Sequence, residues 1–282
     1  MGNKNYHIGL YEKAMPSSLN WEEKLKCAKD CGYDFVEISI DETDARLARL
    51  EWTAQERAQL RETMQKIGVP IRSMCLSGHR KYPFGASDPA VRRRSLEIME
   101  KAIQLSDDLG IRVIQLAGYD VYYEEGSEQT RKDFADNLKK AVEMAAVHGV
   151  VLGFETMETE FMNTVAKSMK YVSLIDNPYL GVYPDVGNLT NAAKTYGTSM
   201  LDDLETGRGH LVAIHLKETV PGKFREIPFL TGHVDFPAVI RKGWQLGVRR
   251  FVTEMWDTGK PEWKEDICFA HDKMSEILDT ME

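Results

Sequence analysis

The sequence predicts a (β/α)8 barrel, in which eight parallel strands alternate with helices around a closed sheet. Eight short apolar runs alternate with eight longer amphipathic segments along the 282 residues. Glycines follow several of the helical segments, where a helix that precedes a strand typically ends. Such alternation implies parallel strands joined by right-handed crossovers, and eight units in about 250 residues match the size of this barrel.

The expected strands are short apolar runs that lie between turn or helical segments. Four of them fall in the first half of the chain and four in the second half. Their expected ranges are 6–12, 34–40, 71–77, 111–117, 150–155, 179–185, 211–217 and 250–255.

The expected helices carry apolar residues at helical spacing, as Leu96, Met99 and Ile103 do. Clear examples are 21–31, 53–67, 89–109, 128–148 and 262–280. An open doubly wound sheet is the main alternative fold, but no G-x-G-x-x-G follows the first strand. No linker of Pro, Ser or Gly divides the chain, so we expect residues 1–282 to form a single barrel domain.

Composition narrows the class of protein. The chain has 36 Lys and Arg against 44 Asp and Glu, a net charge of −8, which argues against a general nucleic-acid binder. It has neither a signal-peptide pattern nor an apolar run of about 18 residues, so we expect a cytoplasmic protein that does not enter membranes. The 4 cysteines, none in C-x-x-C spacing, are expected to be reduced thiols.

Four successive strands of the second half end on polar groups. They are Glu155, Asp185, His215 and Glu254, and in such a barrel the carboxyl ends of the strands carry the chemistry. Singly, a histidine in a strand is more often structural, and Asp185 is also a suitable helix cap. Together, three carboxylates would repel one another unless a cation lay between them. The pattern therefore predicts one divalent ion, Zn²⁺, Mn²⁺, Mg²⁺ or Co²⁺.

Longer runs carry a resemblance to a known family. These runs are GLYEKAMP, GYDFVEISIDETDARLARL, SMCLSGHRKYPFG, LEIMEKAIQLSDDLGIRVIQLAGYDVYY, YPDVGNL, HLKET and EMW. The chain closely resembles the L-ribulose-5-phosphate 3-epimerases, also called L-xylulose-5-phosphate 3-epimerases, which are xylose-isomerase-like barrels. The resemblance covers nearly the whole chain. It implies a metal-dependent epimerase of pentulose 5-phosphates that acts in bacterial use of L-ascorbate, forms a homodimer and places the family's metal ligands on the four strand-end residues.

The sequence also departs from related epimerases of free ketoses. Those enzymes carry a Glu, a His and an Arg where this chain has Phe161, Asn188 and Pro221. The metal ligands match while the free-sugar contacts do not, which favours a phosphorylated substrate. Within the family, the loop after the seventh strand usually contains Gly-x-Gly, and Leu230 replaces the first of these glycines.

The chemistry expected of this set is proton transfer at C3 of a ketose. Epimerisation removes the proton beside the carbonyl and returns one to the opposite face. A metal bound to O2 and O3 would stabilise the cis-enediolate. Glu155 and Glu254 are the expected catalytic pair, one acting as base and the other as acid, and their roles exchange with the direction of reaction.

Five further residues are candidates for substrate binding. Lys217 lies two residues beyond the strand-7 histidine, on the same side of the strand, and is the best candidate for the phosphate. Glu158 and Asn188 are placed to hydrogen-bond sugar hydroxyls. His79 follows the third strand, and Glu37 is an acid inside an apolar strand, which is costly unless paired or functional. The loop cations Lys13, Arg80 and Lys81 are interpreted as solvated.

Three other functions stay open on the sequence. An aldose–ketose isomerase, such as one resembling hexulose-6-phosphate isomerase, would use the same metal ligands. An endonuclease IV-like repair enzyme needs a trinuclear zinc cluster, but only His79 and His215 clearly occupy strand ends and the net charge is unfavourable for DNA. A non-catalytic sugar-phosphate sensor would not need both Glu155 and Glu254.

Overall fold

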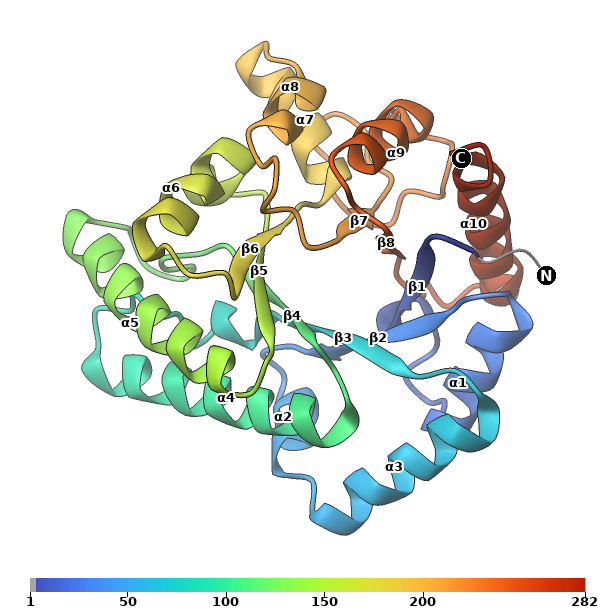
Figure 1. Cartoon of the computed structure of the whole chain (residues 1–282), viewed down its shortest axis with the longest axis horizontal. Helices are drawn as coiled ribbons and strands as arrows, with labels where there is room; N and C mark the ends of the chain where they lie inside the picture. The colour runs from blue at the N-terminus through green and yellow to red at the C-terminus, as the bar shows by residue number, and fades with distance from the viewer. Residues whose placement is uncertain (1–3, 282) are drawn as a thin grey trace.

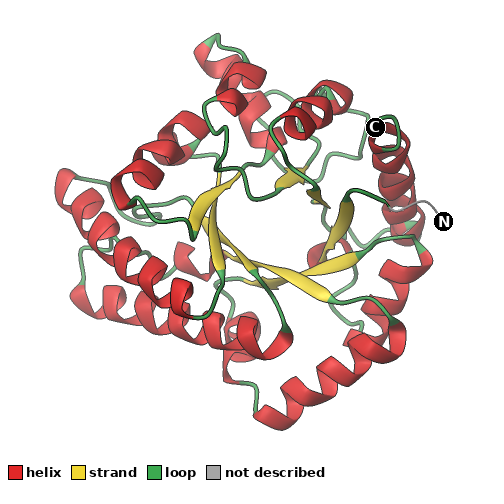
Figure 2. Cartoon of the chain, viewed as in Figure 1, coloured by secondary structure: helices red, strands yellow, loops and turns green. Residues whose placement is uncertain are grey.

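The computed structural model describes residues 4–281, and its centre is a ring of eight strands surrounded by helices (Figure 1, Figure 2). All seven strand pairs are parallel, in the order β6-β5-β4-β3-β2-β1-β8-β7. The strands are β1 (His7–Tyr11), β2 (Phe35–Ile40), β3 (Ile71–Leu76), β4 (Val113–Ala117), β5 (Val151–Glu155), β6 (Leu180–Tyr183), β7 (Ile214–Leu216) and β8 (Arg250–Thr253). The predicted barrel is confirmed, and each strand lies within its expected range.

The helices form the outer layer of the barrel (Figure 2). They are α1 (Trp21–Asp30), α2 (Asp44–Leu47), α3 (Ala54–Ile67), α4 (Pro89–Leu109), α5 (Glu128–Val147), α6 (Val165–Ile175), α7 (Val186–Tyr196), α8 (Met200–Glu205), α9 (Phe236–Gln245) and α10 (Trp263–Leu278). Short 3₁₀ turns are η1 (Glu12–Ala14), η2 (Ala48–Glu51), η3 (Ser77–Arg80) and η4 (Glu160–Met162). Within residues 4–281, each helix is too short or too polar to span a bilayer.

Local signals explain where helices begin and end, and α3 shows both. The Thr53 hydroxyl accepts a hydrogen bond from the backbone N–H of Glu56, and the Glu56 carboxylate accepts one from the backbone N–H of Thr53. The helix ends at Gly68, whose φ of 84° lies in the left-handed region that glycine adopts without steric cost. The sequence therefore defines this helix almost to the residue.

The barrel closes between β6 and β7 through a few backbone hydrogen bonds. The N–H of Val212 donates to the carbonyl of Val182 at 2.9 Å, and the N–H of His215 donates to the carbonyl of Pro184 at 2.9 Å. A parallel bridge also pairs Asp185 with His215. This closure places the carboxyl end of β6 directly beside β7, which positions two of the strand-end residues next to each other.

Apolar side chains fill two regions, one between the sheet and the helices and one inside the barrel. The interior cluster includes Phe35, Val113, Tyr183 and Val252, all buried. Gly9 faces this cluster, because a Cβ there would lie 2.3 Å from the ring of Phe35. The barrel interior is therefore packed with side chains, as expected for this fold.

A disulfide joins the first and the last helix of the barrel, α1 and α10. Cys31, at the end of α1, is bonded to Cys268 of α10, 237 residues away in the sequence. The two helices lie side by side (Figure 1). The expectation of reduced thiols is wrong for this pair, because barrel closure brings together cysteines whose spacing gives no sign of pairing. Cys27 and Cys75 are free and buried.

A buried carboxylate organises the turn after β1. Glu12 is fully buried and forms ion pairs with Lys24, Arg46 and Arg49, the last at 2.6 Å. It also accepts a hydrogen bond from the backbone N–H of Ser39. Burial opposes ionisation, but the surrounding cations outweigh it and lower the pKa of Glu12 to about 2. The cluster ties β1 to β2, α1 and α2.

Candidate active site

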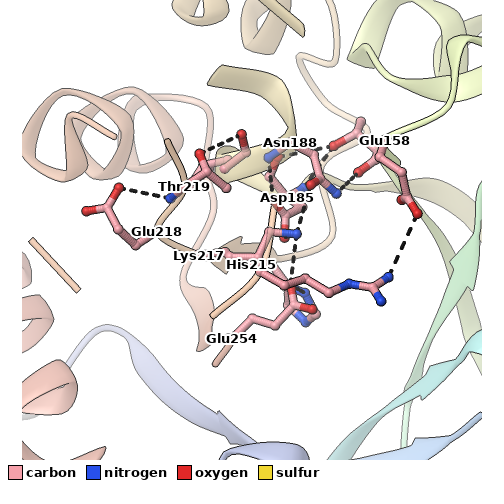
Figure 3. A network of polar contacts seen from close by, with 12 residues as sticks. Glu158, Asp185, Asn188, His215, Lys217, Glu218, Thr219 and Glu254 are labelled. Atoms are coloured by element: carbon pink, nitrogen blue, oxygen red, sulfur yellow. Dashed lines mark hydrogen bonds and ion pairs between the residues drawn. The ribbon is translucent and has the colours of Figure 1, made fainter. Parts of the chain in front are cut away.

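The four strand-end residues meet at the carboxyl end of the barrel. Figure 3 shows three of them, Asp185, His215 and Glu254. Glu155 is the last residue of β5, Asp185 caps α7 just after β6, His215 lies within β7, and Glu254 follows β8. One ligand atom from each lies within 4.8 Å of the others, and all four side chains are buried. The structure thus brings together every residue of the expected metal set.

His215 is held from two sides by carboxylates. Its Nδ1 lies 2.9 Å from Oε2 of Glu254, and its Nε2 lies 2.6 Å from Oε1 of Glu37. Tyr183 donates its hydroxyl to the other oxygen of Glu37 at 2.9 Å. The amide nitrogen of Gln115 lies 3.1 Å from Nδ1. Burial alone would lower the pKa of His215, but the two carboxylates outweigh it and raise the pKa well above its usual value.

Lys217 adds a buried positive charge to the same cluster (Figure 3). Its Nζ lies 2.8 Å from Oδ2 of Asp185, 3.7 Å from Oε2 of Glu254 and 2.8 Å from Oδ1 of Asn188. Burial disfavours the charged amine, but the neighbouring carboxylates outweigh burial and raise its pKa above the ordinary lysine value. The lysine is therefore charged, and it balances part of the negative charge of the three acids.

The carboxyl groups of the cluster differ in their affinity for protons. Burial, followed by the charge of Glu254, raises the pKa of Glu155 to about 7. Burial likewise raises the pKa of Asp185, although Lys217 opposes the shift. Burial acts in the same direction on Glu254, but Lys217 and His215 outweigh it and hold its pKa well below the usual value. One site thus contains a carboxyl group that titrates near neutral pH and one that stays ionised.

A cavity opens above the cluster. Glu155, Lys217 and Glu254 form part of its lining, together with the aromatic side chains of Tyr11 and Trp256. Three further cations line the cavity, namely Lys13, Arg80 and Arg225. The cavity therefore combines acid and base groups with positive charge, which suits an anionic, hydroxylated ligand.

Two predicted substrate contacts also line this cavity. Glu158 accepts a hydrogen bond from the hydroxyl of Tyr119 at 3.1 Å and lies 3.8 Å from a guanidinium nitrogen of Arg225. Asn188 lies in the first turn of α7, where its amide donates to the carbonyl of Thr156 at 2.8 Å and accepts from Lys217. Its amide oxygen is therefore already engaged within the protein.

The structure does not bring His79 or Glu37 to the described lining of the cavity. His79 is buried against Phe84, its Nε2 lies 3.1 Å from the carbonyl of Ser95, and burial lowers its pKa to about 4. Glu37 is fully buried beneath His215. Each of these two side chains turns into the protein, where internal hydrogen bonds engage it.

Sequence reasoning missed several members of the site. Arg80 was expected to be solvated, yet its side chain is largely buried and stacks over Tyr122. Arg225 lies in the long loop after β7, where no local pattern marks it. Gln115 had a usable signal, because a polar amide within the apolar strand β4 is costly unless it has a partner.

The donor set fits a divalent metal ion. Three carboxylates and one imidazole, buried and converging, supply the oxygen and nitrogen ligands that Mn²⁺, Mg²⁺, Co²⁺ and Zn²⁺ accept. A cation at this position would also offset the repulsion among the acids. Glu155, Asp185, His215 and Glu254 could therefore hold the ion, while the mixed ligand set does not select one metal.

Comparisons with known proteins identify the family of the chain. Residues 25–272 match the family model described as xylose isomerase-like TIM barrel. The chain is 49% identical over 260 residues to SgbU, a putative L-ribulose-5-phosphate 3-epimerase of Escherichia coli K12, covering 90% of each protein. It is 44% identical over 273 residues to UlaE, the L-ribulose-5-phosphate 3-epimerase of Escherichia coli SE11, covering 96% of this chain and 95% of that protein.

Solved structures of similar fold include sugar epimerases. A structure of L-ribulose 3-epimerase superposes with a TM-score of 0.78 at 18% identity, covering 98% of this chain and 95% of that one. A D-psicose 3-epimerase from Clostridium cellulolyticum H10, solved with D-tagatose, gives a TM-score of 0.79 at 14% identity, covering 96% and 99%. At these identities the likeness establishes the fold.

The chain is a xylose isomerase-like TIM-barrel enzyme, as shown by its barrel, its strand-end cluster and its match to the family model. Within that class the chain belongs to the L-ribulose-5-phosphate 3-epimerase family, on the strength of 44–49% identity across at least 90% of its length. It is therefore an enzyme of the isomerase class, an epimerase.

Proposed function

We propose that this enzyme is a metal-dependent 3-epimerase that interconverts L-ribulose 5-phosphate and L-xylulose 5-phosphate. The observation that carries the proposal is the joint position of Glu155 and Glu254, two buried carboxyl groups that line one cavity beside additional cations. The names of the relatives at 44–49% identity support the same substrate pair.

Proton transfer at C3 is the task of Glu155 and Glu254. They extend from β5 and β8, with β6 and β7 between them around the barrel, so they approach the cavity from different directions. One carboxylate removes the C3 proton, and the other, protonated, returns a proton to the opposite face of the sugar. A divalent metal bound by the cluster would supply the positive charge that stabilises developing negative charge on the sugar oxygens. Asp185 and His215 complete the ligand set.

The cations of the cavity favour a phosphorylated sugar. Lys13 is paired with Asp41 at 2.5 Å, and Lys217 is engaged by Asp185. Arg80 and Arg225 are less committed, because their ion pairs with Glu42 and Glu158 are 3.9 and 3.8 Å long. Guanidinium groups bind phosphate oxygens in a forked geometry, so we assign the phosphate end of the substrate to these two arginines.

The proposal extends to the organisation of the protein. We propose that residues 1–282 act as one domain, and that the enzyme works as a homodimer in the cytoplasm without a nucleic-acid or membrane partner. The single sheet of eight strands and the match over residues 25–272 support the first point. Gel filtration with light scattering tests the second, since a mass near 32.1 kDa would contradict a dimer.

The decisive experiment follows the C3 proton. Metal-loaded enzyme is incubated in D2O with L-ribulose 5-phosphate or L-xylulose 5-phosphate, and the sugars are followed by NMR. Deuterium at C3 with inversion is the expected result. The unphosphorylated pentuloses serve as matched substrates and are expected to react far more slowly. Deuterium at C1 or C2, or a labelled aldose, would instead identify an aldose–ketose isomerase, and no reaction with either phosphate would overturn both functions.

A further inference from the structure

A chain of buried polar contacts runs from the strand-end cluster into the interior of the barrel. Glu254 contacts Nδ1 of His215 at 2.9 Å, and Nε2 of the same ring contacts Oε1 of Glu37 at 2.6 Å. Tyr183 then donates its hydroxyl to Oε2 of Glu37 at 2.9 Å. The participants come from β2, β6, β7 and the end of β8, so the chain crosses the barrel.

Glu37 has no access to the cavity. Its side chain is 0% exposed, and the described residues that line the cavity do not include it. Within residues 4–281, its one ion-pair partner is His215. An uncompensated buried carboxylate is strongly destabilising, so this position retains an acid only if its contacts offset the cost. Whatever Glu37 contributes to the reaction must therefore pass through His215.

We propose that Glu37 is a positioning residue of the metal site, which accepts a hydrogen bond from Nε2 of His215 and thereby presents Nδ1 toward the other ligands. Tyr183 fixes Glu37 in turn by occupying its second oxygen. The inference rests on the proposed function, because it assumes that the cluster of Glu155, Asp185, His215 and Glu254 binds a metal.

The physical reason lies in the two nitrogens of the imidazole ring. A neutral histidine carries one N–H and one lone pair, and only the lone pair binds a metal. Glu37 accepts only from a nitrogen that carries a proton, so it selects the tautomer whose lone pair is on Nδ1. The same contact restrains rotation of the His215 ring, because Oε1 of Glu37 lies 2.6 Å from Nε2. A carboxylate behind a metal-binding histidine increases the basicity of the ring as well.

Metal affinity tests this role without recourse to turnover. Wild type, Glu37→Gln and Tyr183→Phe are stripped with chelator and titrated with Zn²⁺ or Mn²⁺ against a chromophoric competitor. Glu37→Gln is expected to bind about 10- to 100-fold more weakly, since that is the usual effect of removing such a partner. Tyr183→Phe, one contact further away, is expected to lose about threefold.

A matched control separates positioning from general damage. Glu12→Gln also neutralises a fully buried glutamate, but one whose partners are Lys24, Arg46 and Arg49 rather than a metal ligand. It is expected to unfold more easily and to keep its metal affinity within about twofold of wild type. An equal loss of affinity in Glu12→Gln and Glu37→Gln would overturn the proposal.

Histidine NMR gives a readout that a packing role would not change. In zinc-loaded, ¹⁵N-histidine-labelled enzyme, the Nε2–H of His215 is expected as a slowly exchanging downfield proton, identified by its loss in His215→Asn. It should move upfield in Glu37→Gln and shift less in Tyr183→Phe.

If Glu37→Gln does not fold, Tyr183→Phe with unchanged affinity and an unmoved proton would overturn the proposal. Wild type that binds no metal would overturn the proposed function as well, whereas tight binding by both wild type and Glu37→Gln would overturn only the role of Glu37.

Discussion

Lys217 and Asp185 form a buried ion pair, with Nζ of the lysine 2.8 Å from Oδ2 of the aspartate and side chains only 4% and 0% exposed. The pair joins the residue that follows β7 to the N-cap of α7. It places a positive charge beside Asp185 and Glu254, two of the proposed metal ligands. The protein therefore carries part of the charge balance that a metal ion would otherwise have to supply alone.

Removal of that charge should make the protein depend on metal. In Lys217→Met, the buried carboxylates lose their cation, and the free energy of unfolding in EDTA should fall by about 3–5 kcal/mol, the usual effect of breaking a buried pair. Added Zn²⁺ or Mn²⁺ should raise the Tm of the variant more than that of wild type. Lys242→Met, which breaks the partly exposed pair with Glu205, is the control in thermal unfolding. Equal losses in both variants would contradict the charge-balancing role.

Neutralising either catalytic candidate should abolish epimerisation. Glu155→Gln and Glu254→Gln are each expected to lower kcat by about 10²- to 10⁴-fold, because each removes one of two proton-transfer groups. Metal content is measured in parallel, since both residues are also candidate ligands. One of the two variants should still exchange the C3 proton with D2O, because a single base suffices for exchange. Glu143→Gln, on the exposed face of α5, is the control, and near-normal turnover in both main variants would contradict the mechanism.

Arg80 and Arg225 should act on substrate binding more than on turnover. Arg80→Ala and Arg225→Ala are each expected to raise KM for a pentulose 5-phosphate about 10- to 150-fold, because a charge-assisted contact contributes about 1.5–3 kcal/mol. The kcat should change much less. Arg208→Ala, whose exposed side chain pairs with Glu205, is the control in steady-state assays. Unchanged KM in both cavity variants would place the phosphate elsewhere.

Glu12 should make the protein sensitive to acid. Its pKa falls from 4.5 in the unfolded chain to about 2 in the fold, so its contribution is complete above about pH 4.5 and is lost as the pH falls toward 2. That shift corresponds to about 3 kcal/mol at neutral pH. Glu12→Gln should therefore unfold at lower urea concentration at pH 7, and its difference from wild type should shrink near pH 2.5.

An exposed carboxylate provides the control for this pH dependence. The contacts of Glu205 with Arg208 and Lys242 lower its pKa to about 2, but the side chain lies at the surface. Solvent screens such pairs, so Glu205→Gln should lose much less stability than Glu12→Gln. A difference between wild type and Glu12→Gln that stays constant from pH 7 to pH 2.5 would show that the carboxylate charge is not what stabilises the turn.

The disulfide should be visible in the number of reactive thiols. Denatured enzyme purified without reductant should expose two thiols, Cys27 and Cys75, and four after reduction. Reduction should also lower the Tm, because the bond closes a very long loop, with an upper limit of about 5 kcal/mol. Cys268→Ser should reproduce this loss, whereas Cys27→Ser, also on α1, should not. Four thiols before reduction would contradict the bond.

The sequence by itself determined the barrel and the residues at its strand ends. Helix and strand periods are local properties, and signals such as the Thr53 cap and Gly68 mark boundaries within a few residues. Because parallel strands place all their carboxyl ends on one edge, four polar residues at successive ends could be placed together before any coordinates existed. The sequence alone therefore indicated that Glu155, Asp185, His215 and Glu254 form one cluster.

Only the tertiary structure decided where each side chain turns and which distant partner it meets. His79 follows β3 and Glu37 lies within β2, yet one packs on Phe84 and the other contacts Nε2 of His215. Cys31 and Cys268 meet because closure of the barrel brings α1 beside α10. Such contacts depend on strand register and on rotamers chosen by packing across the whole ring, and local sequence patterns contain no information about either.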